Sequence, residues 1–352
     1  MCLNIKDRTN LELDKESWQV SHERQSWIHN GSHRPPPYFE WWYIHFVTPE
    51  GVAINLVLHE TDIFGQHDSP YLSMSVHRPG KPICYLKRAL PLAIITRNRP
   101  YLQAGSELLA ESKRSIFFDV NFPGEASLKG EMVKLAPRLV FGNGILFADS
   151  QTGRTSYWMI AAPHASFTAQ LHLDGTVLNL EGMAYQDHQW GTLPLQDMVA
   201  DWTWGHFSNP QMAAVFFQIR TQRGQLIQRV GVTTAGGRFT DTSLDSEFLK
   251  TLSNTVSPEE YSDNVEVDFF SKNLQLEFAI SPTKLMRWRI NEPLGNRAVS
   301  YLRWAATGAY QDACARHDVY GISEYIRVRP GAYGSLPESE YRQYYLWDHD
   351  GD

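Results

Sequence analysis

The chain is poor in cysteine, with three in 352 residues: Cys2, Cys84 and Cys314. Their separations match neither a disulfide framework nor the paired spacing of a zinc site. We therefore expect free thiols, which are typical of a reducing compartment, and we predict a cytoplasmic protein.

Long apolar runs are also missing from the sequence. No stretch approaches the ~20 apolar residues that cross a bilayer, so we predict no transmembrane segment. The first residues, Met1 to Asn10, include several charges and lack the apolar stretch of a signal peptide. A membrane-borne substrate would then be reached by transient membrane contact.

Positive charge is neither abundant nor clustered. The net charge is −7, and charges of both signs are interspersed along the chain. Because no basic stripe is present to follow a phosphate backbone, we expect no nucleic-acid partner. The sequence also lacks a glycine-rich phosphate loop and the Gly-x-Ser-x-Gly elbow of serine hydrolases.

Histidine is plentiful, but it is not spaced as metal ligands are. Among thirteen histidines no His-x-His or His-Glu-x-x-His pattern occurs. We expect neither a metal ion nor an organic cofactor, and a metal site assembled across strands is the alternative. The ligands considered for it are His59, Glu60, Asp62, His67, His188 and His206.

Short alternating runs rich in β-branched and aromatic residues predict an all-β protein. Turn residues separate these runs, and no βαβ rhythm occurs, so we predict two lipocalin-like antiparallel β-barrel or sandwich domains with few short helices. The best helix candidate is Ser243 to Asn254. The predicted strands include 41–47, 52–58, 71–76, 115–120, 156–161, 167–173, 212–220, 226–232, 265–270, 274–280, 284–290, 298–305 and 321–328.

The length of 352 residues favours two domains, because single cores stop growing at ~250–300 residues. Trp190 to Pro194 reads as a strand that leaves one unit for another. We therefore predict an N-terminal domain over 1–195 and a C-terminal domain over 196–352. The segment after Pro330 is interpreted as a surface tail.

Aromatic residues make up 12% of the chain, and three segments combine them with ionisable groups. In the first, Tyr185 to Gly191, an extended backbone places Tyr185, Asp187 and Gln189 on one face and Gln186, His188 and Trp190 on the other. An acid between a phenol and an amide is a candidate proton donor. The alternative is a structural Asp that caps a turn or pairs with an arginine.

The second and third segments are Glu40 to Tyr43 and Asp201 to His206. Both faces of the former are apolar, so Glu40 needs a cationic partner or belongs to a polar site. Indole rings over a pocket would stabilise a carbocation by cation–π attraction, worth about 2 kcal/mol when desolvated. The alternative is that these rings are core. Candidate pocket residues are Glu40, Trp42, Trp158, Gln189, Trp202, Trp204 and His206.

Glu40-Trp41-Trp42-Tyr43, then Tyr185-x-Asp187-x-x-Trp190-Gly191, then Asp201-Trp202-x-Trp204, in this order, resemble the carotenoid 1,2-hydratase and AttH-like superfamily. The resemblance covers roughly residues 38 to 328. It implies two lipocalin-like domains and activity on isoprenoid or polyene substrates, including hydration and natural-product cyclisation.

The resemblance also implies roles for single residues. The family's catalytic acid matches Asp187, with Tyr185 as its neighbour, and a contributing tryptophan matches Trp158. The hydratases have a histidine close to that tryptophan. Here Ser156 and Tyr157 precede it and no histidine is adjacent, which weakens the case for hydration specifically.

We predict an acid-initiated hydratase or cyclase that acts on an apolar isoprenoid or polyene, with Asp187 kept protonated by burial. One alternative is a pericyclase, of the Diels–Alder type, in which Tyr185, Gln189 or His188 hydrogen-bonds an activating carbonyl. Another is a carrier of a lipid or pigment, since barrels commonly hold one apolar ligand.

Overall fold

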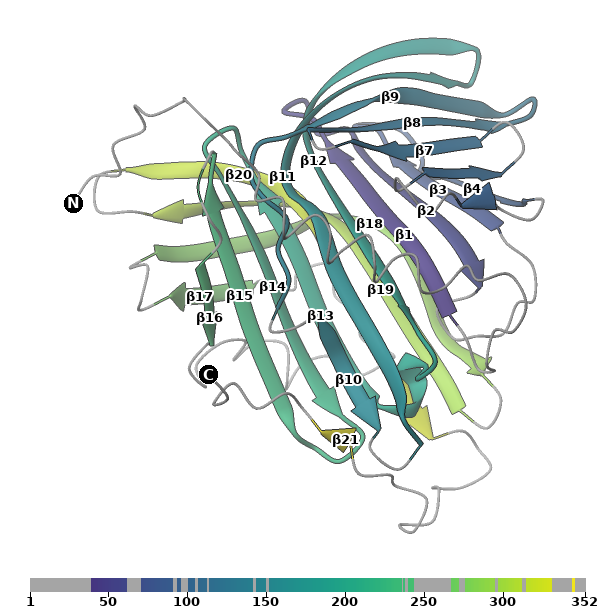
Figure 1. Ribbon diagram of the computed structural model, residues 1–352. Helices are drawn as coiled ribbons and strands as arrows, with labels where there is room; N and C mark the ends of the chain where they lie inside the picture. Colours follow the sequence, from purple (N-terminus) through teal and green to yellow (C-terminus); the bar gives the residue numbers. More distant parts are fainter. Residues whose placement is uncertain are drawn as a thin grey trace.

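The computed structural model is built almost entirely of antiparallel β-strands (Figure 1). Among the residues that it describes there is no α-helix, only the single-turn 3-10 helix η2 (Leu195–Asp197). The predicted all-β class is therefore confirmed. The described residues are 39–61, 71–90, 94–95, 101–104, 107–112, 114–141, 144–149, 152–235, 237, 240–243, 267–271, 276–294, 297–311, 315–330 and 344–345.

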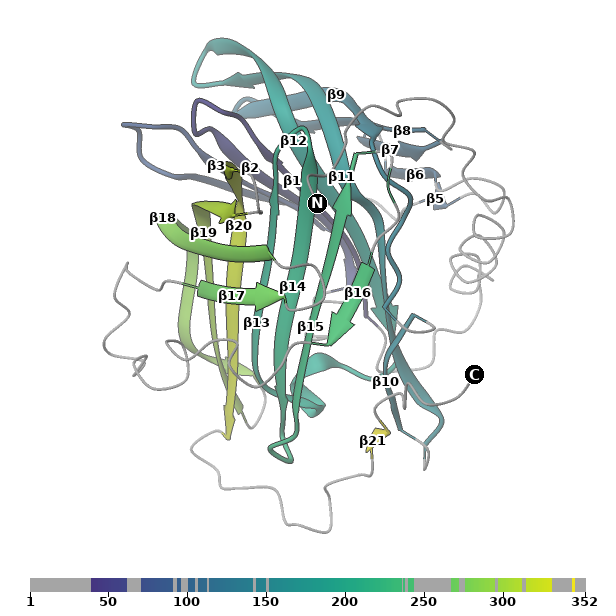
Figure 2. The ribbon, with the colours of Figure 1, turned by 90° about the vertical axis from the view of Figure 1, so that its left-hand side faces the viewer.

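The first sheet has 13 strands in the order β4-β3-β2-β1-β12-β11-β9-β8-β7-β6-β5, with β10 and β21 branching from β11. Its two arms curve so that β7–β9 face β2–β4 (Figures 1 and 2). The strands are β1 (Phe39–Val47), β2 (Ala53–Thr61), β3 (Tyr71–His77), β4 (Cys84–Ala89), β5 (Ile94–Ile95), β6 (Tyr101–Ala104), β7 (Glu107–Glu111), β8 (Ser115–Phe122), β9 (Ala126–Lys134), β10 (Ile145–Asp149), β11 (Arg154–Leu173), β12 (Thr176–Gly191) and β21 (Tyr344–Tyr345).

The second sheet has 8 strands in the order β16-β15-β14-β13-β20-β19-β18-β17. The chain passes from one sheet to the other through η2, next to the predicted domain boundary at residue 195. The short β21 returns to the first sheet and pairs with β10. The strands are β13 (Val199–Ser208), β14 (Met212–Thr221), β15 (Leu226–Thr234), β16 (Thr240–Ser243), β17 (Val267–Ser271), β18 (Leu276–Leu294), β19 (Arg297–Gln311) and β20 (Arg316–Pro330).

Two pairs of predicted strands are single long strands in the structure, which corrects the prediction. The runs 156–161 and 167–173 both belong to β11, and the runs 274–280 and 284–290 both belong to β18. Each long strand continues past a proline by shifting register, near Pro163 in β11 and Pro282 in β18. A β-bulge accommodates a residue that cannot donate to the ladder, so the proline bends the strand without ending it.

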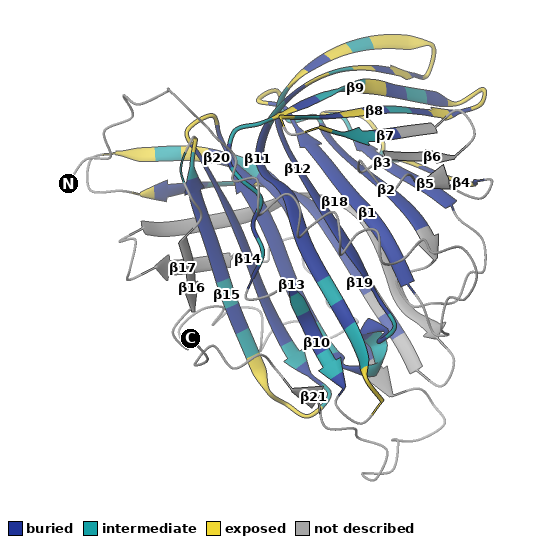
Figure 3. Cartoon of the chain, viewed as in Figure 1, coloured by how far each residue is buried: buried dark blue, intermediate teal, exposed yellow. Residues whose placement is uncertain are grey.

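Two large apolar clusters form most of the core of the described residues, and Figure 3 shows how much of the strands is buried. One lies between the arms of the first sheet and includes Trp42, Ile44 and Phe46. The other joins the two sheets and includes Trp41 and Tyr43. Strand β1 therefore divides its side chains between the clusters by simple alternation, as its sequence predicts. Most of the candidate functional residues lie in or beside the inter-sheet cluster.

Several predictions concern residues outside those described. These are the helix over Ser243 to Asn254, except for Ser243 at the end of β16, most of the tail after Pro330, and the candidate ligands Asp62 and His67. Of the cysteines only Cys84 is described, and it is a free, partly buried thiol. In the described part of the chain, no helix has the length and apolar character to cross a bilayer.

Candidate active site

Asp187 lies at the centre of the contact between the sheets. Its strand, β12, pairs with β1 on one side and β11 on the other, so that Tyr43 and Ile160 stand opposite Asp187. The residue is 3% exposed, and no arginine among the described residues is hydrogen-bonded to it. The structure thus places this acid in the protein interior, on the face of β12 that looks toward the second sheet.

The two carboxyl oxygens of Asp187 have different surroundings. The Tyr185 hydroxyl donates to Oδ2 at 2.8 Å, and the indole Nε1 of Trp158 donates to the same oxygen at 3.1 Å. Oδ1 is buried and has no hydrogen-bond partner among the described residues. Because two donors occupy Oδ2, the proton of the neutral acid belongs on Oδ1.

The pKa of Asp187 is raised from 3.8 to about 7. Burial is the main cause, and the hydrogen bonds from Tyr185 and Trp158 oppose it because they favour the charged form. A substantial fraction of the acid is therefore protonated near neutral pH. This is the protonation state that an acid catalyst requires.

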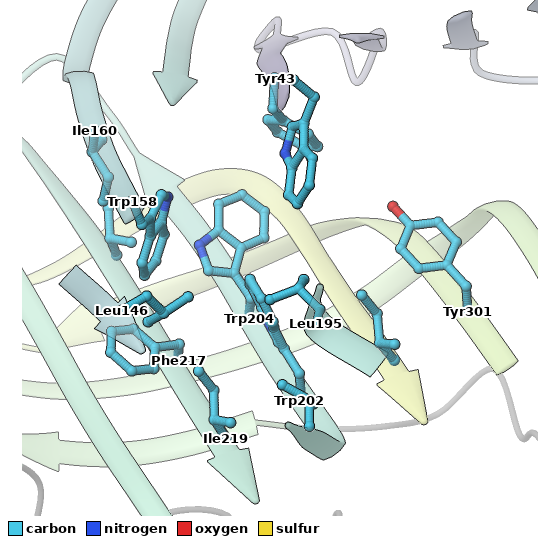
Figure 4. Packing of buried hydrophobic residues seen from close by; sticks show 14 of the residues in the cluster. Tyr43, Leu146, Trp158, Ile160, Leu195, Trp202, Trp204, Phe217, Ile219 and Tyr301 are labelled. Atoms are coloured by element: carbon cyan, nitrogen blue, oxygen red, sulfur yellow. The ribbon is translucent and has the colours of Figure 1, made fainter. Parts of the chain in front are cut away.

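Figure 4 shows aromatic rings of the inter-sheet cluster, and one of them, Trp158, donates to the acid. The Trp158 ring packs against Trp202, with centroids 6.1 Å apart, and against Phe217 at 5.3 Å. Trp204 packs against Tyr185 at 5.3 Å. The indole Nε1 atoms of Trp202 and Trp204 are buried without a hydrogen-bond partner within the described ranges. The surroundings of Asp187 thus combine aromatic rings with a few polar atoms that have no hydrogen-bond partner among the described residues.

Three of the site residues predicted from the sequence, Glu40, Trp42 and His188, lie on the opposite face of the first sheet from Asp187. His188 Nε2 contacts Glu40 Oε1 at 2.7 Å, and Trp42 stacks on the His188 ring with centroids 4.5 Å apart. The structure therefore groups these three with one another and away from the acid. It also supplies a partner for Glu40, as its burial in an interior strand requires.

Gln189 shares the inward face with Asp187, two residues further along β12. Its side chain is buried, and Oε1 has no hydrogen-bond partner among the residues described. Of the ten candidate site residues, those near the inter-sheet cluster are Tyr185, Asp187, Gln189, Trp158, Trp202, Trp204 and His206.

The sequence reasoning missed a buried ion pair between Arg303 on β19 and Glu324 on β20. Arg303 Nε donates to Glu324 Oε1 at 2.5 Å, and its other nitrogens reach Asn55 Oδ1 on β2 and the Tyr301 hydroxyl. The guanidinium also lies over the Tyr43 ring, 5.1 Å from its centroid. Arg303 is a cation within the otherwise apolar run 298–305, and this feature of the sequence could have indicated a buried ion pair.

This ion pair influences the phenol at the centre of the contact. Burial, followed by the charge of Glu324, raises the pKa of Tyr43 well above its usual value. The pKa of Arg303 is raised despite its burial, chiefly by the charge of Glu324. Tyr43 therefore stays a neutral phenol and Arg303 stays charged.

No metal centre emerges from the described residues. No three His, Cys, Asp or Glu side chains within them gather as ligands would. His59 instead stacks on Tyr71, with centroids 4.1 Å apart.

Several solved structures of other proteins superpose on the fold of this chain. The protein of Nitrosomonas europaea described as AttH superposes with a TM-score of 0.55 at 14% identity, over 86% of this chain and 98% of that one. CghA gives 0.63 at 10% identity, over 85% and 90%. Kievitone hydratase from Nectria haematococca gives 0.55 at 12%, over 82% and 88%. These similarities show the fold alone, which is lipocalin-like as predicted.

Sequence comparison is more specific. The quinolone epoxide rearrangement protein asqO of Emericella nidulans is 27% identical over 89 residues, which are 25% of this chain and 24% of asqO. The match thus spans about a quarter of that relative's length. The model of the carotenoid hydratase CrtC family matches residues 92–267, half of the chain, including Asp187 and Trp158. The chain therefore belongs to the carotenoid hydratase CrtC family.

Proposed function

We propose that this protein is a cofactor-independent hydratase or cyclase in which protonated Asp187 gives its proton to an alkene of an apolar isoprenoid or polyene substrate. The observation that carries the proposal is the asymmetry of the Asp187 carboxyl. Oδ2 is held by Tyr185 and Trp158, while Oδ1 is buried and unpartnered among the described residues. Such an acid is oriented, protonated in a substantial fraction near pH 7 and free to donate.

The chemistry follows from this arrangement. Transfer of the proton to a trisubstituted alkene leaves a tertiary carbocation and an Asp187 carboxylate. Trp158, Trp202 and Trp204 supply π faces near the acid, each able to stabilise a desolvated cation by about 2 kcal/mol. Water then gives an alcohol, or an internal nucleophile gives a ring. General acid catalysis contributes about 10²–10⁴-fold in rate.

An epoxide is a second group that the same acid would protonate. The name of the relative asqO describes an epoxide rearrangement, and its match with this chain makes an epoxide-bearing substrate worth testing. In that case Asp187 protonates the epoxide oxygen, and the cation arises as the C–O bond breaks. The aromatic walls would serve the same purpose in both reactions.

A deuterium experiment tests the proposal. The purified protein is incubated in D₂O with squalene or lycopene, two acyclic isoprenoids with terminal trisubstituted alkenes. We expect one non-exchangeable deuterium on a product carbon, detected by mass spectrometry and NMR. Asp187→Asn should abolish this label, while Asp149→Asn, a buried carboxylate on β10 bonded to Thr152, should keep it.

The other outcomes of this experiment select among functions. Cyclised product without carbon-bound deuterium would indicate a pericyclase, because no proton moves to carbon in that reaction. A ligand recovered unchanged and unlabelled after long incubation would indicate a carrier. Either outcome would rule out the acid mechanism for these substrates.

A further inference from the structure

Two buried histidines connect the sheets beside the candidate acid. His45 on β1 and His206 on β13 are both fully buried, and His45 Nε2 lies 2.8 Å from His206 Nδ1. His206 Nε2 in turn lies 2.9 Å from the carbonyl oxygen of Pro163 on β11. Three strands that are distant in sequence thus meet in one chain of hydrogen bonds.

The carbonyl fixes which ring nitrogens carry hydrogen. A carbonyl oxygen only accepts, so His206 Nε2 is the protonated nitrogen. Burial, which outweighs the carbonyl contact, lowers the pKa of His206 to about 3, so this ring is neutral and its Nδ1 accepts. His45 Nε2–H must then be the donor between the two rings.

The other nitrogen of His45 is left with a lone pair. Burial first, then the neighbouring His206 and the charge of Arg303, hold the pKa of His45 well below its usual value. The ring is therefore neutral, and with hydrogen on Nε2 its Nδ1 is bare. Nδ1 is buried and has no hydrogen-bond partner among the described residues.

Strand register places His45 on the same face of the first sheet as Asp187. His45 stands opposite Tyr185, and Tyr43 stands opposite Asp187, so His45 is the diagonal neighbour of the acid. Diagonal neighbours lie about 7–8 Å apart, and their Cβ atoms are somewhat closer than that. In inverting glycosidases, two carboxyl groups about 6.5–9.5 Å apart leave room for a water between them.

Tyr185 links the two groups. Its ring stacks on His45, with centroids 5.1 Å apart, and its hydroxyl donates to Asp187 Oδ2. The other titratable or charged groups around His45 are Tyr43 on β1, His206 on β13 and, through its charge, Arg303 on β19. An imidazolium at this position would have aromatic faces as neighbours.

Other buried imidazoles do not share this position. His188 is on the opposite face of β12 and binds Glu40. His164 also has an unpartnered Nδ1 within the described ranges, but its Nε2 donates to the carbonyl of Asn209, past the register shifts that bend β11 away from Asp187. Only His45 among these three is a cross-strand neighbour of the Tyr185–Asp187 pair.

We propose that His45 is the general base that completes the reaction begun by Asp187, an inference that rests on the proposed function. After Asp187 has protonated the alkene, a water or substrate hydroxyl attacks the cation and forms the new C–O bond. His45 Nδ1 takes the proton that this oxygen loses. The imidazolium then returns a proton through water to the Asp187 carboxylate as product leaves, so the net reaction adds water or closes a ring.

An experiment in D₂O with squalene and lycopene distinguishes proton transfer to the alkene from the attack of oxygen on the cation. In His45→Phe, which keeps an aromatic ring against Tyr185, alcohol formation should fall by about 10²–10⁴-fold. Proton transfer from Asp187 should persist, because the cation collapses back to alkene. The recovered alkene should therefore gain deuterium. Asp187→Asn should give neither label nor product.

Matched variants guard against a purely structural explanation. His164→Phe removes a buried imidazole of the same kind and should leave both label and product at wild-type levels. If His45→Phe does not fold, as judged by its circular dichroism, His45→Gln is used in its place. Addition of free imidazole to His45→Ala should restore product, which a structural role would not allow.

The results distinguish the two proposals. Absence of label with wild-type protein overturns the acid mechanism for these alkenes, and the base role with it. Product formation by His45→Phe at the wild-type rate overturns the base role alone. In the ligand-free protein, ¹⁵N NMR of labelled histidine should show Nδ1 of His45 without hydrogen, and a protonated Nδ1 would equally rule the role out.

Discussion

At the residue scale, the two carboxyl oxygens of Asp187 differ in their contacts. Tyr185 and Trp158 hold Oδ2, which fixes the carboxyl plane and leaves Oδ1 to carry the proton. Part of this arrangement could be predicted from the sequence. The two-residue spacing of Tyr185 and Asp187 predicted a shared face, but the donor from Trp158 depends on the pairing of β11 with β12, which spacing alone does not give.

The first prediction concerns pH. If Asp187 donates the proton, turnover requires its neutral form. Its pKa is about 7, so the rate should be constant below that pH and fall about tenfold per unit above it. A profile of kcat/KM from about pH 5 to about pH 9 checks this, because kcat/KM reports the pKa of the free enzyme. A flat profile over that range would contradict the acid role.

The second prediction concerns the donors to Oδ2. Both hydrogen bonds lower the pKa of Asp187, so Trp158→Phe, which removes one donor, should raise it. The alkaline limb of the rate profile should then move to higher pH, and Tyr185→Phe should move it in the same direction. Phe141→Leu, which alters packing against Trp158 without touching the acid, is the control. An unmoved limb in Trp158→Phe would argue against the hydrogen bond.

At the element scale, the contact between the sheets depends on charged and polar bridges as well as on apolar packing. Arg303 joins β19 to Glu324 on β20 and to Asn55 on β2, while His45 and His206 join β1 to β13. The alternation of side chains within a single strand predicts none of these bridges. Each needs the register between strands far apart in the chain, which explains why the sequence reasoning missed the ion pair.

The third prediction follows from the Arg303–Glu324 pair. Arg303→Met leaves a buried carboxylate without its partner and should lower the free energy of unfolding by about 3–5 kcal/mol. The double variant Arg303→Met/Glu324→Leu should recover much of that loss, because no uncompensated charge remains. Chemical denaturation measures both. Lys129→Met, from an exposed ion pair with Asp119, is the control and should change little.

At the scale of the whole molecule, the buried ionisable groups make stability depend on pH in two opposing ways. The folded-state pKa of Asp187 is raised, so its contribution is fully present below about pH 4 and is lost as pH rises through about 7. The pKa values of His45 and His206 are lowered, so their contribution is present above about pH 6.5 and is lost on acidification.

The fourth prediction isolates the acid. Asp187→Asn cannot ionise, so its stability relative to the wild type should increase between about pH 4 and about pH 8, by up to about 4 kcal/mol for a shift of about three pKa units. Denaturation curves of both proteins at the two pH values test this. A constant difference would mean that Asp187 ionises in the folded protein as it does in water.

The fold class and the family could be predicted from the sequence, because each rests on a pattern that lies within one strand or one motif. Alternation in β1 separated Trp42 from Tyr43, and the aromatic segments identified the superfamily. The continuity of β11 through Pro163 was not predictable, because proline normally argues against a strand interior and the bulges that absorb it depend on neighbouring strands. The roles of the candidate site residues stay predictions.

The pairing of β1 with β12 has a consequence for how quickly the protein assembles. Tyr43 and Asp187 stand opposite each other although most of the first sheet separates them along the chain. Hairpins such as β8–β9 close short loops and form early, whereas a pairing of such long sequence separation must wait for slow loop closure. During refolding, native secondary structure should therefore return before the environment of Asp187 does, and catalytic competence should be the last property regained.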